Sequence, residues 1–351
     1  CESTAEGELL DPLNGLSDLH NGLIRTVGDP ETRFREDALR ILRGVRFAIR
    51  FNLTPDAKTG RAMVTQAPLM RKLARERVFD ELCKLILLAS PEDLLRFAPV
   101  ITQVIPELKP QLGYDQRNHH HIHDLFTHTA LVTAAMPQSL PLRWAALLHD
   151  IGKPKTKRWD PVMKWTFHNH NIVGEKMTLK LFRDYKMPQN EKMKYVQKLV
   201  GLHMRPIVIA DEEVTDSAVR RLLFEAGDDI DDLMLLCEAD ITSGIDAKVK
   251  RYLANFELVR RKMKDLEERD RVRNFQPPIT GDIIMKCYDL QPCSAIGEIK
   301  EVIKNAILDG EIRNDYAEAY ALMERLAAER GLTKVCDVEC PAPKVEDTNE
   351  E

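Results

Sequence analysis

The feature that most constrains this chain is a helical periodicity that extends over most of its length. From Phe34 onward, apolar residues recur at spacings of three and four, as they do on one face of a helix. Strand-like alternation is nearly confined to the short segment KWTFHN, and turn segments such as MPQSLP, KMPQNE and AGDD separate the helical stretches. The pattern predicts an all-α fold built from several multi-helix modules.

Several individual helices can be placed from the sequence. The segment REDALRILRGVRFAIRF predicts one helix over about 35–50, and RERVFDELCKLILLAS predicts a second that ends at Ser90-Pro91. Towards the C-terminus, SAIGEIKEVIKNAILDG and NDYAEAYALMERLAAERG each end near a glycine, which favours helix termination. Residues 7–28 are rich in Gly, Asp and Pro, and here we expect only short strand-like pieces and turns.

With 351 residues, the chain is long enough for two or three helical modules, each with a core of its own. We expect a remnant of a preceding domain, a helical body, a central metal-binding domain, a helical RNA-binding tail and a disordered end. These segments are assigned to residues 1–20, 21–115, 116–250, 251–335 and 336–351.

Charge and cysteine content exclude some classes of protein. The 51 Lys and Arg residues nearly balance 56 Asp and Glu residues, so any RNA binding must come from local basic patches. Seven cysteines without a CxxC pair indicate reduced thiols in the cytoplasm, where we expect the protein to reside. No apolar run reaches about 18 residues, so we expect no membrane partner.

A candidate metal site centres on His149 and Asp150, which close the apolar helix RWAALLHD before the helix-ending IGKP. Two residues cannot complete a coordination shell of about six ligands, so other side chains must converge on them. His128 in DLFTHTA and Asp240 in LLCEAD are flanked by apolar residues that turn them inward. An inward histidine is more often an ordinary core residue, but an inward aspartate is costly to bury without a cation.

The motif order H…HD…D, with LLHDIGKP at 147–154, resembles the HD phosphohydrolase superfamily. The resemblance implies that a divalent metal (Mg, Mn, Ni, Co or Fe) is bound and that an activated water attacks a phosphate ester. The metal ligands that it implies are His128, His149, Asp150 and Asp240.

Three further residues extend this candidate site. Lys153, one turn after Asp150, is placed to meet a phosphate oxygen as a catalytic residue, unless it is a solvated surface lysine. His170 and His203 resemble the extra ligands of superfamily members that hold two metals; the alternatives are contact with the substrate phosphate alone or a pocket-lining role. The cluster His119–His123 cannot chelate one ion as a whole, because consecutive side chains diverge, and only His123 is kept as a candidate.

A second resemblance lies in the first 90 residues. A DP-x-x-G-x-x-DL turn (Asp11 to Leu19), an ED-x-x-R helix (Glu36 to Arg40) and an ER-x-x-x-E helix (Glu76 to Glu81) follow one another. This order is similar to that in class II tRNA nucleotidyltransferases, which comprise CCA-adding enzymes and bacterial poly(A) polymerases. The resemblance continues after the metal-binding region, through ITGDIIMKCYDLQPCSAIGEIKEVIKNAILDGEI.

This resemblance implies a nucleotide-binding site for CTP and ATP. Asp37 and Arg40 would offer an acceptor and a donor to the base edge, and their i, i+3 spacing predicts that they share one helix face. Arg43 and Arg46 would support the triphosphate or the RNA backbone. The alternative is a salt-bridged surface helix.

The family's nucleotide-adding step needs a glycine-rich turn followed by an Asp-x-Asp pair that holds two magnesium ions, and no such combination occurs here. We therefore expect a piece of a longer CCA-adding-type enzyme. Alone, it would retain only hydrolysis of phosphate monoesters or 2′,3′-cyclic phosphates, with tRNA or another RNA 3′ end as partner. The alternatives are a stand-alone HD hydrolase of small nucleotides, or an RNA-binding module with an inactive HD site.

Overall fold

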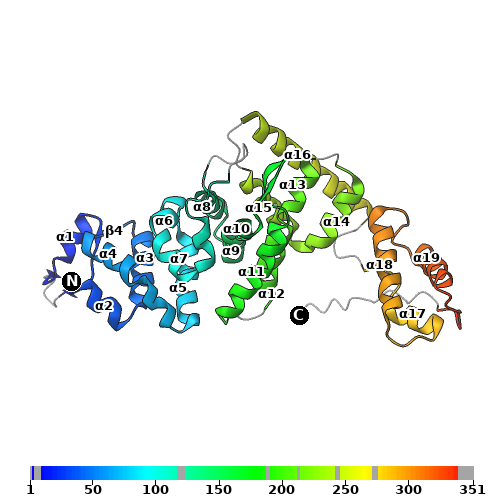
Figure 1. Cartoon of the computed structure of the whole chain (residues 1–351), viewed down its shortest axis with the longest axis horizontal. Coiled ribbons are helices and arrows are strands. Elements are labelled where there is room, and N and C mark those ends of the chain that lie inside the picture. Colours follow the sequence, from blue (N-terminus) through cyan, green and yellow to red (C-terminus); the bar gives the residue numbers. More distant parts are fainter. Residues whose placement is uncertain are drawn as a thin grey trace. The chain divides into compact units, whose positions relative to one another are not determined.

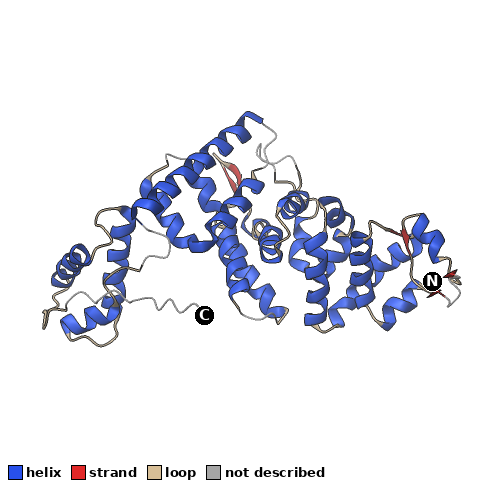
Figure 2. Cartoon of the chain, turned by 180° about the vertical axis from the view of Figure 1, so that it is seen from behind, coloured by secondary structure: helices blue, strands red, loops and turns tan. Residues whose placement is uncertain are grey.

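The computed structural model describes residues 2–3, 9–116, 123–186, 190–211, 214–241, 246–270 and 276–338. Helices dominate these residues, which confirms the all-α prediction (Figures 1 and 2). The described strands form three two-stranded sheets, the first and third antiparallel and the second parallel. They are β1 (Glu2–Ser3) with β2 (Leu9–Leu10), β3 (Leu23–Ile24) with β4 (Thr54–Pro55), and β5 (Arg158–Asp160) with β6 (Lys164–Thr166).

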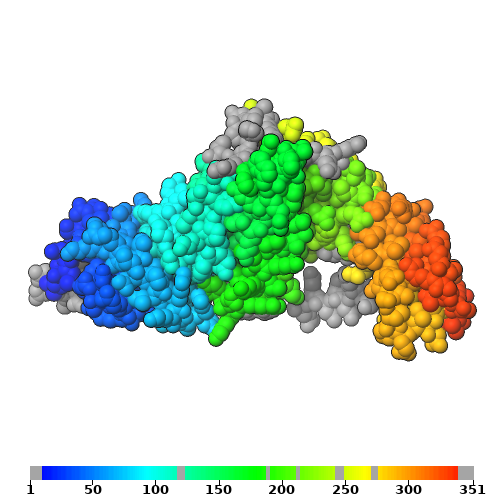
Figure 3. All heavy atoms as spheres, viewed as in Figure 1, coloured from blue at the N-terminus to red at the C-terminus, as the bar shows by residue number. Residues whose placement is uncertain are grey.

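The chain divides into two compact units, which Figure 3 colours by residue number. Unit 1 comprises Cys1–Val208 and Asp231–Ala254, and unit 2 comprises Ile209–Ile230 and Asn255–Glu351.

The first part of unit 1 contains the helices α1 (Gly15–His20), α2 (Pro30–Glu36), α3 (Leu39–Arg50), α4 (Ala57–Gln66), η1 (Ala67–Lys72), α5 (Arg75–Leu88), α6 (Pro91–Arg96), α7 (Ala98–Val104) and η2 (Pro106–Gln111). It continues with α8 (Leu125–Ala135), α9 (Leu140–Leu148), α10 (Lys153–Thr156), α11 (His170–Asp184) and α12 (Glu191–Leu202). The unit boundaries fall in or next to α13 (Met204–Asp211), α15 (Ile230–Asp240) and α16 (Asp246–Asp270). Unit 2 also contains α14 (Asp216–Ala226), η3 (Gly227–Asp229), α17 (Gly281–Tyr288), α18 (Ser294–Asp309) and α19 (Tyr316–Glu329).

Most of the predicted elements are found. The helix α5 follows RERVFDELCKLILL, the helices α18 and α19 occupy the two predicted C-terminal segments, and KWT forms β6. Gly310 ends α18 with a left-handed backbone at φ 77°, a conformation that glycine adopts without strain. Residues 339–351 of the predicted disordered end lie outside the described residues.

The prediction of one continuous helix over 35–50 is wrong. The chain leaves helical geometry at Asp37 (φ −148°, ψ 103°), between α2 and α3. The Asp37 carboxylate there accepts a hydrogen bond of 3.0 Å from the Leu39 backbone N–H. Aspartate favours such helix boundaries because its side chain competes with the helix for backbone donors.

The segment 7–28 also contains more order than expected, because α1 lies within it. Both oxygens of the Asp11 carboxylate accept backbone N–H groups, those of Gly15 and Leu16, at 2.7 Å each. The first aspartate of the DP-x-x-G-x-x-DL turn thus satisfies donors at the start of a helix. None of the described helices combines the length and apolar character needed to cross a bilayer.

Candidate functional site

The six residues proposed as metal ligands all lie at one place in unit 1. They come from helices that are far apart in sequence, and α9 packs against both α8 and α12. Most of these side chains are fully buried, and the most exposed, that of Asp240, retains only 8% of its surface. The positions are His128 in α8, His149 and Asp150 directly after α9, His170 at the start of α11, His203 directly after α12 and Asp240 at the end of α15.

Two overlapping groups of potential ligands can be distinguished. In the first, one ligand atom from each of four residues lies within 4.8 Å of the others. His128 Nε2 is 2.8 Å from Asp240 Oδ1 and 3.3 Å from His149 Nε2. The four residues are His128, His149, Asp150 and Asp240.

The second group consists of Asp150, His170 and His203, so Asp150 belongs to both. Its Oδ1 faces the second group, 3.3 Å from His170 Nε2 and 3.9 Å from His203 Nε2. Its Oδ2 faces the first group, 3.3 Å from His149 Nε2 and 3.6 Å from His128 Nε2. The two oxygens of one carboxylate are therefore divided between the two groups.

The orientation of three imidazoles is fixed by the backbone. His149, His170 and His203 each place Nδ1 within 2.6–2.8 Å of the carbonyl oxygen three residues earlier. A carbonyl only accepts, so each Nδ1 carries a proton and donates it, and Nε2 is the nitrogen that faces the other candidate ligands. Hydrogen bonds of this kind orient the histidine ligands of metal sites.

The donor set fits a divalent cation. Both Asp150 oxygens are buried and lack a hydrogen-bond partner among the described residues. A buried carboxylate without hydrogen bonds is strongly unfavourable unless a positive charge compensates for it. Lys153 Nζ lies 2.6 Å from Asp150 Oδ2, though not in hydrogen-bond geometry, and supplies part of this compensation.

Burial and neighbouring charges shift the pKa values of the titratable groups in the cluster in opposite directions. Burial alone would lower the pKa of His149, but the Asp150 and Asp240 carboxylates raise it to about 10. Burial lowers the pKa of His203 to about 3, and His170 and His149 act in the same direction. Burial would raise the pKa of Asp150, but Lys153 and His149 hold it well below its usual range. In the metal-free protein, the Asp150 carboxylate thus stays ionised and His149 holds an additional proton at the place where a cation would bind.

Lys153 is not the solvated surface lysine of the alternative interpretation. It is buried, with 6% of its surface exposed, and its ammonium donates to the Gln116 side-chain oxygen at 3.3 Å. Gln116 is itself buried, and no sequence pattern singles it out. His123 is exposed and belongs to neither ligand group, and the rest of the cluster up to residue 122 lies outside the described residues.

Gly152 is a second residue that the sequence prediction missed. A Cβ atom at this position would lie 2.1 Å from the His170 carbonyl oxygen and 2.9 Å from the Gly174 backbone nitrogen. The backbones of Gly152 and His170 can approach so closely only without a side chain at 152. The sequence pattern predicts only a helix end at IGKP, whereas the glycine also allows two ligand-bearing segments to approach each other closely.

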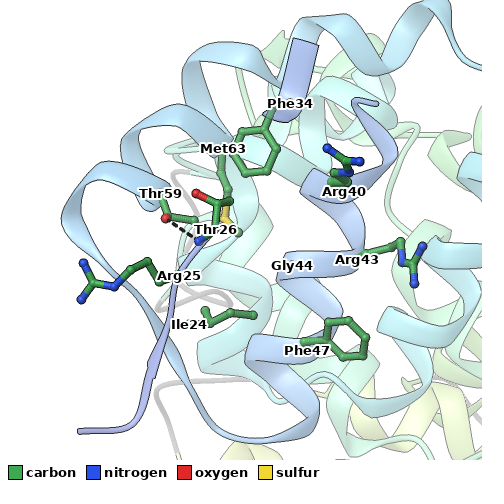
Figure 4. Close-up of a pocket in the computed structure, with 10 residues that line it drawn as sticks. All are labelled: Ile24, Arg25, Thr26, Phe34, Arg40, Arg43, Gly44, Phe47, Thr59 and Met63. Carbon is green, nitrogen blue, oxygen red and sulfur yellow. Dashed lines mark hydrogen bonds between the residues drawn. The ribbon is translucent and has the colours of Figure 1, made fainter. Parts of the chain in front are cut away.

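A separate cavity of about 350 Å³ lies in the helical body (Figure 4). Arg40, Arg43 and Phe47 project from α3, with Ile24 and Thr26 on the facing segment. The complete lining is Ile24, Arg25, Thr26, Phe34, Arg40, Arg43, Gly44, Phe47, Thr59 and Met63. The cavity lining thus combines three arginines with two phenylalanines.

Asp37 and Arg46, which the resemblance assigns to base and to triphosphate or RNA backbone contact, both lie near charged side chains of α5. Asp37 does not line the cavity, and its carboxylate lies 3.6 Å from Arg77 Nη2. Arg46 Nε lies 2.8 Å from Glu81 Oε2, and both side chains are largely buried. The Glu81 of the ER-x-x-x-E motif therefore holds α3 against α5.

Comparison with known proteins agrees with this architecture. Residues 125–245 match the HD domain, and residues 52–112 match the probable RNA and SrmB-binding site of polymerase A. These matches define an HD-domain protein with a region typical of poly(A) polymerases.

Relatives cover most of the chain. The A-adding tRNA nucleotidyltransferase of Deinococcus radiodurans is 30% identical over 92% of this chain and 75% of its own length. The multifunctional CCA protein of Azoarcus sp. (strain BH72) is 37% identical over 43% of this chain and 39% of its own. The crystal structure of the Bacillus stearothermophilus CCA-adding enzyme in complex with CTP shares the fold, with a TM-score of 0.53 and 22% identity over 93% of this chain and 71% of that one. The chain belongs to the tRNA nucleotidyltransferase family.

Proposed function

We propose that unit 1 carries a metal-dependent phosphohydrolase, which acts on phosphate monoesters and 2′,3′-cyclic phosphates. The observation that carries this proposal is the position of Asp150, with one oxygen towards each of two ligand groups. A carboxylate so placed suits two cations side by side, and sites of that kind are adapted to displacement at phosphorus.

Each candidate residue has a proposed role in holding a cation or the substrate phosphate. The first cation would be held by His128, His149, Asp150 and Asp240, and the second by Asp150, His170 and His203. A bound divalent cation supplies an activated water and neutralises phosphoryl charge. Lys153, held between Asp150 and Gln116, would donate a hydrogen bond to a phosphate oxygen.

The substrate proposal follows from the family. The relatives are tRNA-processing enzymes by name, and residues 52–112 match an RNA-binding region. We therefore place the hydrolysed phosphate at the 3′ end of tRNA or a similar RNA, in the cytoplasm. A stand-alone hydrolase of small nucleotides is the less favoured alternative.

The test combines metal analysis with turnover. The purified chain should bind divalent metal and should release phosphate from p-nitrophenyl phosphate and open the ring of 2′,3′-cyclic AMP. Asp150→Asn, which keeps the shape but removes the charge shared by both groups, should abolish both activities. A wild-type chain that binds tRNA but holds no metal and turns over neither substrate would support the inactive RNA-binding module instead.

We also propose that the cavity of the body is a CTP and ATP site, in which Arg40 and Arg43 bind phosphate or base. Asp37, at the boundary before α3, is the candidate acceptor for the base edge. Calorimetry should show weaker CTP binding in Arg40→Ala and Arg43→Ala and unchanged binding in the exposed control Arg50→Ala. Equal affinities in all variants would remove the nucleotide from this cavity.

A further inference from the structure

The hairpin β5–β6 exposes aromatic and apolar side chains that nothing in the described residues covers (red in Figure 2). Trp159 is 56% exposed, and at the turn Val162 and Met163 are 85% and 65% exposed. The Trp159 and Trp165 rings pack edge to face, with centroids 5.1 Å apart. Exposed tryptophan is unusual enough on a protein surface to suggest a binding role.

Basic side chains surround these rings. The segment from Lys155 to Thr166 contains four basic residues and one acid, Asp160, although the whole chain is negatively charged. The Asp160 carboxylate is used in the turn, where it accepts the backbone N–H groups of Val162 and Met163. The hairpin is therefore a local basic patch of the kind that RNA binding requires in this acidic chain.

Two of the lysines hold the rings in place. Lys157 Nζ lies 4.5 Å from the Tyr114 ring centroid and 4.7 Å from that of Trp165. Lys164 Nζ lies 5.6 Å from the Trp159 centroid. Cation–π contacts of this kind restrain an exposed ring without burying its outer face.

The hairpin begins and ends at the candidate metal centre. On one side it follows α10, whose first residue, Lys153, contacts Asp150. On the other side Thr166 precedes Phe167, whose carbonyl accepts the Nδ1–H of His170. The hairpin is thus connected at both ends to segments that contact the candidate metal ligands.

We propose that this hairpin binds the single-stranded end of an RNA, with a base stacked on Trp159 and phosphates near Arg158 and Lys164. Stacking on an aromatic side chain combined with a basic groove is the usual mode of single-strand recognition, and it tolerates any base. The inference rests on the phosphohydrolase function proposed above and deepens it, because it names the surface that binds the RNA end.

The charge pattern favours RNA over a lipid surface or a protein partner. Each strand carries one basic residue beside its tryptophan, Arg158 in β5 and Lys164 in β6, so a purely apolar contact would bury a guanidinium and an ammonium group. Phosphates would meet these groups while a base covers the ring.

Intrinsic fluorescence offers a direct test, because the chain has three tryptophans and the third, Trp144, is buried. A short oligoadenylate should quench the emission, and the quenching should weaken as salt is raised. Trp159→Ala should weaken binding about 10-fold, and Trp159→Phe should restore most of it. Quenching with unchanged affinity in Trp159→Ala, or a response to anionic phospholipid vesicles but not to RNA, would overturn the proposal.

A kinetic test separates the hairpin from the hydrolytic centre. On an RNA ending in a 2′,3′-cyclic phosphate, Trp159→Ala and Lys164→Glu should raise KM about 10-fold. Their kcat/KM for 2′,3′-cyclic AMP should match that of the wild type. Lys180→Glu, an exposed lysine on α11, is the matched charge control and should change neither value.

The two proposals fail differently. If the wild type hydrolyses neither substrate but oligoadenylate still quenches the tryptophan fluorescence in a Trp159-dependent way, the hydrolase proposal is refuted and RNA binding by the hairpin is supported. If 2′,3′-cyclic AMP is hydrolysed and RNA turnover is unchanged by substitution of Trp159 and Lys164, RNA binding by the hairpin is refuted and the hydrolase proposal is supported.

Discussion

The substitution Gly152→Ala should separate the two ligand groups of the candidate metal centre. The new Cβ would lie 2.1 Å from the His170 carbonyl oxygen, about 1.3 Å short of the 3.4 Å at which ordinary contact begins. The atoms that the new Cβ would meet, the His170 carbonyl oxygen and the Gly174 nitrogen, both belong to the backbone, so the clash cannot be relieved by moving the end of a flexible side chain. The Gly152 and His170 segments must therefore move apart by a distance of this order.

That displacement is large compared with the tolerance of a metal site. His170 Nε2 is 3.3 Å from Asp150 Oδ1 and 3.1 Å from His203 Nε2, while metal–ligand distances are held to about 0.2 Å. The second group should lose its cation, and the first group, which lacks His170, should retain one. Overpacking of this kind costs about 3 kcal/mol, which lowers Tm by roughly 6–12 °C in a domain of this size.

Metal-to-protein ratio by plasma mass spectrometry and Tm by calorimetry would check the prediction. Gly174→Ala is the control, because its Cβ would meet nothing nearer than the Val200 side chain at 3.3 Å, with the His149 carbonyl oxygen and the Ile151 side chain at 3.6 Å. We expect Gly152→Ala to bind one cation fewer than wild type and Gly174→Ala to bind the full number. Wild-type stoichiometry and Tm in Gly152→Ala would refute the assigned role of this close approach.

Three further predictions concern the same unit. Metal binding near pH 8 should release about one proton, because His149 with its pKa of about 10 must deprotonate, whereas His203 with its pKa of about 3 is already neutral. Affinity should then rise about tenfold per pH unit up to that pKa, and calorimetry in buffers of different ionisation enthalpy that shows no released proton would contradict it. Lys153→Ala should retain metal but release phosphate about 100-fold more slowly, since removal of one preorganised donor has effects of this size; an unchanged rate would make the lysine purely structural. Glu81→Ala should lower the free energy of unfolding, measured in urea, by about 2–4 kcal/mol, because it leaves Arg46 unpaired. The control Glu191→Ala, at the exposed first residue of α12, should change this free energy little.

The ligand residues could be predicted because each combines an unusual residue type with an apolar context. A buried aspartate such as Asp240 needs a partner, and periodicity alone places it inward. The position of Asp150 between two groups could not be predicted, because it depends on how five separate helices pack together. Gly152 was missed for a similar reason: its importance comes from a contact with His170, far along the chain.

The error at Asp37 has a local cause. The apolar periodicity of α3 continues smoothly into α2, and nothing in the pattern distinguishes a helical aspartate from a capping one. Only the observed bond to the Leu39 N–H decides between them. Arg46 shows the converse, since its place in a nucleotide motif suggested a ligand contact and the structure pairs it with Glu81.

The close approach of Gly152 to His170 also bears on how such a protein can diversify. The Gly152 and His170 backbones approach each other closely on either side of the hairpin, so the residues between them form a loop that is closed at its base. We expect that replacing, lengthening or trimming this segment would leave the positions of the candidate ligands unchanged. The hairpin could then differ from one relative to another while the candidate metal centre stays the same.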